Sequence, residues 1–393
     1  MSRITFILLA FTVLLASCGP QTATTRSGAF DPYVRSEEQV TPAPQQPPFL
    51  PRQPSVQTNK VAILLPLSGP HSQIGESLLN AAQLALFDMK DPSVELVPFD
   101  TQGTPTGTAN AMTKAIRNNV KLVLGPVLAD NVDQAGKMAR QHNLNVIGFT
   151  TDSARTGGNV FTVGILPYDQ GQRLAQYAGR HKLNRIVAII PQNQYAQEIT
   201  TAFEKTASSN GLSIVQKVQL SPASDVNVLA QQLASAKGQF DALLMPVGNP
   251  QMVSLAQALT NNGLSATNVA WLGAGLWDDT NVTSNPLMRG ALYAAPSTQT
   301  RRNFVAQYRT VYGQTPQRLS SLGYDATALA IVLLKQRGGQ ITTADLLNSN
   351  GFNGVDGVFR FNSNGMTERG MAIHRISGRD QTQIAERAPT GFR

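Results

Sequence analysis

Short apolar runs alternate with longer amphipathic segments along most of this chain. Val61 to Leu65 is the first apolar run, a turn follows at Leu67 to Pro70, and apolar positions then recur with helical spacing from Ser72 to Met89. Continuous apolar strands joined by helices are typical of parallel sheets that are covered on both faces, so the predicted fold class is α/β. Further strands are expected at 94–99, 120–124, 146–149, 161–165, 186–190, 212–218, 242–247, 270–273 and 290–295.

The last part of the chain has a different pattern. A long apolar stretch from Leu319 to Lys335 predicts a helix, and Val358 to Phe361 then alternates with a period of two. Asn362 to Gly365 has turn residues, and Ala372 to Ile376 alternates again. The pattern predicts a β-hairpin between these two strands.

The N-terminus has the features of an export signal. Arg3 precedes an apolar stretch from Ile4 to Ala16, and small residues lead to Cys18. This pattern resembles a bacterial lipobox, which implies that residues 1–17 are a signal peptide and that Cys18 carries a lipid. A plain secretory signal or an uncleaved membrane helix is the alternative, although the run is shorter than the roughly 20 residues that span a bilayer. Gly19 after the cysteine resembles outer-membrane sorting in some bacteria, and inner-membrane anchoring stays open.

Residues 18–59 are rich in proline, glutamine, threonine and serine. Such a segment cannot bury a core and favours extended conformations, so we expect a disordered stalk between the lipid and the folded part. Docking of this segment to a partner is the alternative. From Lys60 onward the composition is globular, and the remaining length suits two lobes.

Cysteine content and charge exclude some functions. Cys18 is the only cysteine, so the chain can form no intramolecular disulfide and has no thiol-based active site in its folded part. Residues 289–393 hold 13 basic and 6 acidic side chains and carry most of the net charge of +8. This basic region is either a solvated face or a surface for an anionic partner. No aromatic and basic motif for nucleic acid is present, and no nucleic acid is expected.

Four segments carry a family resemblance, and the first runs from Val61 to Asp88. The others are Val123 to Pro126, Phe161 to Gly171 and Gly357 to Gly365. Together they resemble type I periplasmic binding proteins of the branched-chain amino-acid receptor kind, which implies a two-lobed fold with a mainly parallel sheet in each lobe. On this basis we expect residues 60–165 plus 277–350 in lobe 1, and 166–276 plus 351–393 in lobe 2.

Within that superfamily, Leu64 to Gly69 most resembles the penicillin-binding-protein activator lipoproteins. Those are outer-membrane-anchored regulators of peptidoglycan synthesis. The resemblance therefore implies a penicillin-binding protein as the partner, with the chain anchored at the periplasmic face of the outer membrane. The alternative is the solute receptor of an ABC importer, which would bind an amino acid or another small polar ligand and dock on a permease.

A receptor for an amino acid must bind a carboxylate and an ammonium group, because unpaired buried charges are costly. Ser68 and Gly69 lie in the turn before a predicted helix, whose N-terminus favours anions. Thr150 and Thr151 follow a strand at its carboxyl end, where ligands bind in parallel sheets. Two further candidates, which could cover a ligand from the second lobe, are Tyr168 and Tyr195.

An acid for the ammonium group is harder to find. Where the resembled amino-acid receptors place one, this chain has Gly248, Asn249 and Pro250, and residues 126–129 lack the expected small hydroxyl side chains. Asp278 beside Trp277 is a substitute if the chain crosses between lobes there; otherwise it is an exposed turn residue. These departures favour a protein partner over an amino-acid ligand.

Catalysis is not expected. The four histidines are far apart in the sequence, and the chain contains no His-x-x-Glu-His, no Gly-x-Ser-x-Gly and no phosphate-binding loop. We therefore predict a non-enzymatic binding protein without a metal site or a cofactor.

Overall fold

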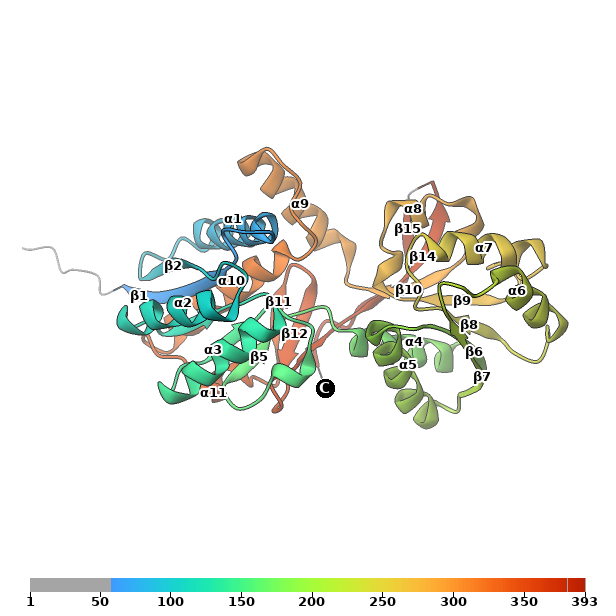
Figure 1. Cartoon of the computed structure of the whole chain (residues 1–393), viewed down its shortest axis with the longest axis horizontal. Helices are drawn as coiled ribbons and strands as arrows, with labels where there is room; N and C mark the ends of the chain where they lie inside the picture. Colours follow the sequence, from blue (N-terminus) through green and yellow to red (C-terminus); the bar gives the residue numbers. More distant parts are fainter. Residues whose placement is uncertain (1–57, 380, 393) are drawn as a thin grey trace, which may run out of the picture. The chain divides into compact units, whose positions relative to one another are not determined.

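Two large β-sheets, each covered by helices, organise the folded part of the chain (Figure 1). The computed structural model describes residues 58–379 and 381–392. The predicted signal peptide, the lipidation site Cys18 and the proline-rich stalk lie outside the described residues.

The first sheet has five parallel strands in the order β2-β1-β3-β4-β5. Figure 1 shows α1 on one side of β1 and α2 and α3 on the other. The strands are β1 (Asn59–Leu65), β2 (Val94–Asp100), β3 (Leu122–Leu124), β4 (Val146–Gly148) and β5 (Val160–Thr162), and the helices around them are α1 (Ser72–Met89), α2 (Pro105–Arg117), α3 (Ala129–Gln141), α10 (Ser320–Gln336) and α11 (Thr343–Leu346).

Strand β1 shows why the sequence of a strand in this sheet is a continuous apolar run. Val61 and Ile63 pack into one hydrophobic cluster with residues of α1 and α10, whereas Ala62 and Leu64 pack into a second cluster with residues of α2 and α3. Successive side chains of a strand point to opposite faces, so a strand that is covered on both faces has no polar position to alternate with. The prediction of an α/β fold with helices on both faces is confirmed.

The second sheet has seven strands in the order β15-β14-β10-β9-β8-β6-β7. Its first five strands in the chain run parallel to one another, and the antiparallel pairs are β10 with β14 and β14 with β15. The strands are β6 (Arg185–Pro191), β7 (Ser213–Leu220), β8 (Ala242–Leu244), β9 (Ala270–Gly273), β10 (Leu292–Ala295), β14 (Ala372–Gly378) and β15 (Gln381–Glu386), and the associated helices are α4 (Pro167–Arg180), α5 (Gln194–Ala207), α6 (Val226–Ser235), α7 (Gln251–Asn261) and α8 (Thr280–Thr283).

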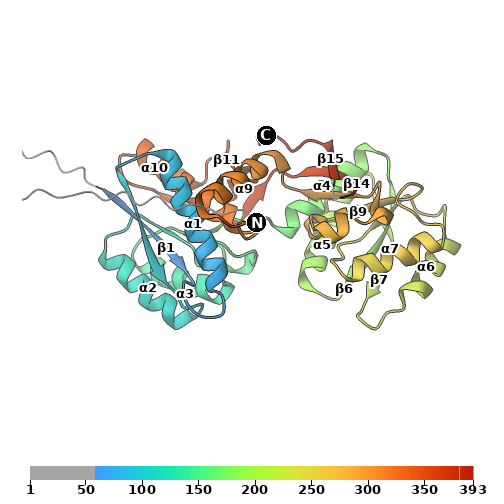
Figure 2. The ribbon, with the colours of Figure 1, turned by 90° about the horizontal axis from the view of Figure 1, so that it is seen from above.

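A small third sheet of β11 (Phe352–Gly354), β12 (Gly357–Phe361) and β13 (Thr367–Arg369) completes the strands. Phe359 and Phe361 of β12 join the hydrophobic cluster of the first sheet. Helix α9 (Thr298–Tyr312), which the sequence analysis missed, lies beside α1 in both views (Figures 1 and 2). Gln307 of α9 donates to Asp88 of α1 at 2.7 Å, and Tyr312 donates to the Asn80 carbonyl at 2.8 Å.

Three sequence predictions for the end of the chain need correction. The hairpin partner of β12 is β13, because the segment 372–376 belongs to β14 and pairs with β10 in the second sheet. Residues 292–295, expected in lobe 1, form β10 beside β9 in the second sheet. Residues 352–369, expected in lobe 2, pack their phenylalanines on the core of the first sheet.

Within residues 58–379 and 381–392, the chain passes three times between the second sheet and the other two. The connections run from β5 to α4, from β10 to α9 and from β13 to β14. Asp278 follows β9, and the next strand, β10, lies in the same sheet. The expected lobe crossing at Asp278 is therefore wrong.

Candidate functional site

The turn at Ser68 and Gly69 is held by Asp100 at the end of β2. Asp100 accepts hydrogen bonds from the Leu67 N–H at 2.9 Å, from the Ser68 hydroxyl at 2.6 Å and from the Gln102 N–H at 2.7 Å. Partial burial opposes these bonds, but together they hold the pKa of Asp100 below its usual value. The Ser68 hydroxyl thus donates its proton within the turn and not to a ligand.

Thr151 and Tyr168 are the two predicted residues that the structure brings to one cavity. This cavity, here the hydroxyl cavity, has a volume of about 320 Å³. Thr151 is exposed, whereas Thr150 is buried and its Oγ1 accepts from the Asp152 N–H at 3.1 Å. The complete lining is Thr151, Leu166, Tyr168, Gln194, Gln197, Glu198, Thr201 and Met366.

One face of α5 supplies half of this lining, and the sequence analysis missed it. Gln194, Gln197, Glu198 and Thr201 follow the spacing i, i+3, i+4, i+7 that places residues on one side of a helix. The Gln194 amide donates to Glu198 Oε1 at 2.7 Å. Glu198 is thus an acid that lines this cavity, and the ends of the strands alone did not reveal it. The polar spacing along α5 is the signal that could have found it.

Tyr195 lies next to these residues but points to a different part of the protein. Its hydroxyl donates to Gln170 Oε1 at 2.8 Å, and the Gly275 N–H donates to the same oxygen at 2.7 Å. Burial raises the pKa of Tyr195 above its usual value. This contact joins α5 to α4 and to the turn after β9, so the Tyr195 hydroxyl has a structural partner.

The remaining candidates lie apart from the hydroxyl cavity. Trp277 is fully buried in the core of the second sheet, and its indole N–H donates to the Val247 carbonyl at 2.9 Å. Its expected place in a ligand cleft is therefore wrong. Asp278 is exposed and accepts from the Tyr293 hydroxyl at 3.3 Å. Asn249 is exposed just before α7.

Two features are absent from residues 58–379 and 381–392. In this part of the chain, no three His, Cys, Asp or Glu side chains are placed so that they could hold a metal ion. Among the helices of the same residues, none has the length and apolar character that a membrane span requires.

Known proteins resemble this chain in sequence and in fold. The penicillin-binding protein activator LpoA of Mannheimia succiniciproducens is 29% identical over 224 residues, which are 53% of this chain and 36% of that protein. The chain thus spans about a third of the length of this curated relative.

Two solved structures share the fold. The C-domain of LpoA (YraM) from Haemophilus influenzae, a regulator of PBP1A, has a TM-score of 0.66 at 17% identity, with 83% of this chain and 100% of that chain covered. A putative branched-chain amino acid ABC transporter from Rhodospirillum rubrum has a TM-score of 0.76 at 17% identity, with 83% and 99% covered.

These likenesses confirm the predicted type I periplasmic-binding-protein fold. The sequence pattern of the family described as "Periplasmic binding protein" matches residues 58–382, which is most of the chain. The chain belongs to the periplasmic binding protein family.

Proposed function

We propose that this chain is a non-catalytic lipoprotein that activates a penicillin-binding protein and so regulates peptidoglycan synthesis. The observation that carries the proposal is the likeness to LpoA: the fold of the Haemophilus C-domain is matched over its full length, and the Mannheimia protein shares sequence with half of this chain. The lipobox at Cys18 and the proline-rich segment support anchoring at the periplasmic face of the outer membrane, with a reach towards a synthase.

The geometry of the predicted cleft residues agrees with a function at the protein surface. The hydroxyl of Ser68, the hydroxyl of Tyr195 and the indole of Trp277 each donate to a group of the protein itself. A ligand would have to compete with these internal hydrogen bonds, and each exchange of partners yields little net free energy.

The test is a reconstituted synthesis assay. The full-length chain is added to a bifunctional penicillin-binding protein of the same organism, and the rates of glycan polymerisation and peptide cross-linking are measured. We expect direct binding and a higher rate of at least one reaction, with no change for a monofunctional penicillin-binding protein as the control. Absence of both binding and acceleration would refute the proposal.

A solute receptor is the second candidate, and the hydroxyl cavity is the observation in its favour. Glu198 could pair with an ammonium group there, and the hydroxyls of Thr151, Tyr168 and Thr201 could meet a carboxylate or amide. A thermal-shift screen with amino acids, amides and muropeptide fragments tests this function. Stabilisation by an amino acid that Glu198→Gln removes would support it.

The matched control for that screen is Glu204→Gln. Glu204 lies on the same helix, but its carboxylate pairs with Lys217 at 2.6 Å, and it does not line the hydroxyl cavity. If no amino acid stabilises the protein, or if both variants weaken the shift equally, the receptor function is not supported.

A further inference from the structure

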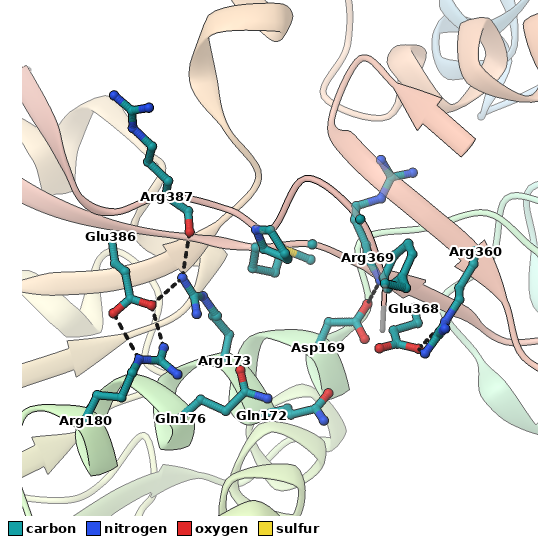
Figure 3. Close-up of a pocket in the computed structure, with 15 residues that line it drawn as sticks. Asp169, Gln172, Arg173, Gln176, Arg180, Arg360, Glu368, Arg369, Glu386 and Arg387 are labelled. Atoms are coloured by element: carbon teal, nitrogen blue, oxygen red, sulfur yellow. Dashed lines mark hydrogen bonds and ion pairs between the residues drawn. The ribbon is translucent and has the colours of Figure 1, made fainter. Parts of the chain in front are cut away.

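A second cavity, which neither function above uses, is lined by charged side chains (Figure 3). We name it the arginine cavity; its volume is about 320 Å³. One wall is the face of α4, and the others are Arg360 of β12, residues 368–371 at the end of β13 and just after it, and the end of β15 with the residues that follow. Figure 3 shows Arg173, Arg180 and Glu386 together at one end, and Arg360 and Glu368 at the other.

Positive charge exceeds negative charge in this cavity. Five arginines and three carboxylates line it. Glu386 alone faces two guanidinium groups, Arg173 at 2.8 Å and Arg180 within hydrogen-bonding distance, and the His181 imidazole lies at 3.8 Å. At the other end, Glu368 pairs with Arg360 at 2.8 Å. The cluster around Glu386 therefore keeps a positive charge that no carboxylate among its ion pairs neutralises.

Arg173 is the most buried arginine of the cluster around Glu386. Its side chain is only 11% exposed, and one terminal nitrogen donates to the Arg387 carbonyl at 2.8 Å. Its Nε is buried and has no hydrogen-bond partner among the described residues. A buried, charged N–H group without an acceptor is costly, so the protein partners of the Arg173 guanidinium leave part of its donor capacity unused.

The other lining groups restrict the charge and chemistry of any ligand bound here. Gln172 and Gln176 lie one turn apart on the same face of α4 as Arg173 and Arg180, and they present neutral amides to the cavity. Glu368 and Glu386 at the two ends would repel a doubly charged anion such as phosphate. The cavity is also larger than one carboxylate needs, so the anion belongs to a molecule with a polar body.

We propose that the arginine cavity binds a small ligand with one carboxylate group, which Arg173 and Arg180 hold, while Gln172 and Gln176 meet its amide or hydroxyl groups. The planar guanidinium fork matches a carboxylate better than an ammonium group does. This site goes beyond the proposed function and does not depend on it, because it would bind its ligand with or without a synthase.

Calorimetric titration of the full-length chain tests the proposal with two sugars. N-acetylmuramic acid has one carboxylate and an N-acetyl amide, and N-acetylglucosamine is its neutral counterpart. We expect heat of binding from the acid only. Arg180→Gln should weaken that binding about tenfold, because it removes a charge-assisted contact.

Arg185→Gln is the matched control. Arg185 is 46% exposed and pairs with Asp241 at 2.7 Å, while Arg180 is 47% exposed and pairs with Glu386, so both variants lose one half-exposed, paired arginine. Only Arg180 lines the arginine cavity. Arg173→Lys keeps the charge but removes the fork, and it should also weaken binding, with circular dichroism as the check on folding.

Four outcomes would overturn the proposal. These are no binding of the acid at millimolar concentrations, equal binding of the neutral sugar, unchanged affinity in Arg180→Gln, and binding of inorganic phosphate in place of the acid. The synthase assay is independent of all four, so failure of this site and failure of the activator function can be told apart.

Discussion

Replacing Arg369 with methionine should strongly destabilise the fold, because this side chain is fully buried and charged. Its guanidinium donates to the Gly164 carbonyl at 3.1 Å, lies 3.5 Å from Asp325 Oδ2 and stacks over the Phe359 ring at 4.8 Å. Methionine keeps much of the length but removes the charge and every donor. Asp325 then stays buried without its cation, still accepting from the Val355 N–H at 2.6 Å.

Removing one partner of a buried ion pair costs roughly 3–5 kcal/mol. Here the cost should depend on pH. Burial raises the pKa of Asp325 to about 7, against the lowering effect of Arg369 and with a raising effect of Asp356. Since this folded-state pKa lies above the unfolded value of 3.8, protonation favours the folded state, and that stability is lost as the pH rises through about 7.

Without Arg369 the pKa of Asp325 rises further. The unfolding free energy of the unchanged protein stops falling once the pH exceeds the pKa of Asp325, whereas that of the variant continues to fall up to its higher pKa. The difference in unfolding free energy should therefore be larger at pH 9 than at pH 6. Urea unfolding followed by circular dichroism measures it. The control is Arg360→Met, whose side chain is 23% exposed and pairs with Glu368, with an expected cost of at most about 1 kcal/mol. An equal cost for both variants, or a cost that is independent of pH, would refute the reasoning.

Three further substitutions test single contacts, each by the midpoint of thermal or urea unfolding. Ser68→Ala should cost about 1 kcal/mol, because the bond to Asp100 is lost. Gly75→Ala should destabilise by about 1–3 kcal/mol although alanine favours helices, since its Cβ would lie 2.0 Å from the Pro66 carbonyl oxygen. Trp277→Phe should cost about 1–3 kcal/mol, because the buried Val247 carbonyl loses its donor. For each of the three variants, an unchanged unfolding midpoint would contradict the expectation.

The sheets could be predicted because their signal is local. Helix α1 begins and ends at the residues that the spacing predicts, Ser72 and Met89, and β1 is apolar at every position that two hydrophobic clusters cover. Which strands pair with one another could not be predicted in the same way. Alternation along 372–376 indicates a strand but does not say whether it pairs with its neighbour in the chain or, as here, with distant β10.

Helix α9 was missed although its apolar residues follow a helical spacing. Phe304 and Tyr308 are buried with Leu84 of α1, and Val305 and Tyr312 pack beside them, so apolar positions recur at i, i+1, i+4 and i+8. That stripe is the signal that could have found the helix, whereas its partner lies more than two hundred residues earlier in the chain and could not be predicted from the pattern.

The candidate site was only partly predictable for a related reason. The ends of strands indicate where polar groups gather at the edge of a sheet, but a strand end does not tell whether a side chain faces solvent or a neighbour. Ser68 faces Asp100, and Trp277 faces the Val247 carbonyl. Arg173 was missed for a different reason. Its position within a helix does not indicate a binding site, because the groups around it, Glu386 of β15 and the Arg387 carbonyl, are distant in the sequence and come close only in the fold.

The Arg369 network also bears on the choice between activator and receptor. A receptor that closes on its ligand must bend the connections between its lobes. Arg369 bonds the carbonyl of Gly164 in one connection, and its own N–H donates to Asp169 at the start of α4 at 3.1 Å. Bending that separates these groups would break two buried hydrogen bonds, at roughly 1–3 kcal/mol for each group left without a partner. A ligand of micromolar affinity yields about 8 kcal/mol in all, so closure would consume a substantial part of it. An activator that presents a fixed surface bears no such cost, which is why the buried network favours the proposed function over the receptor.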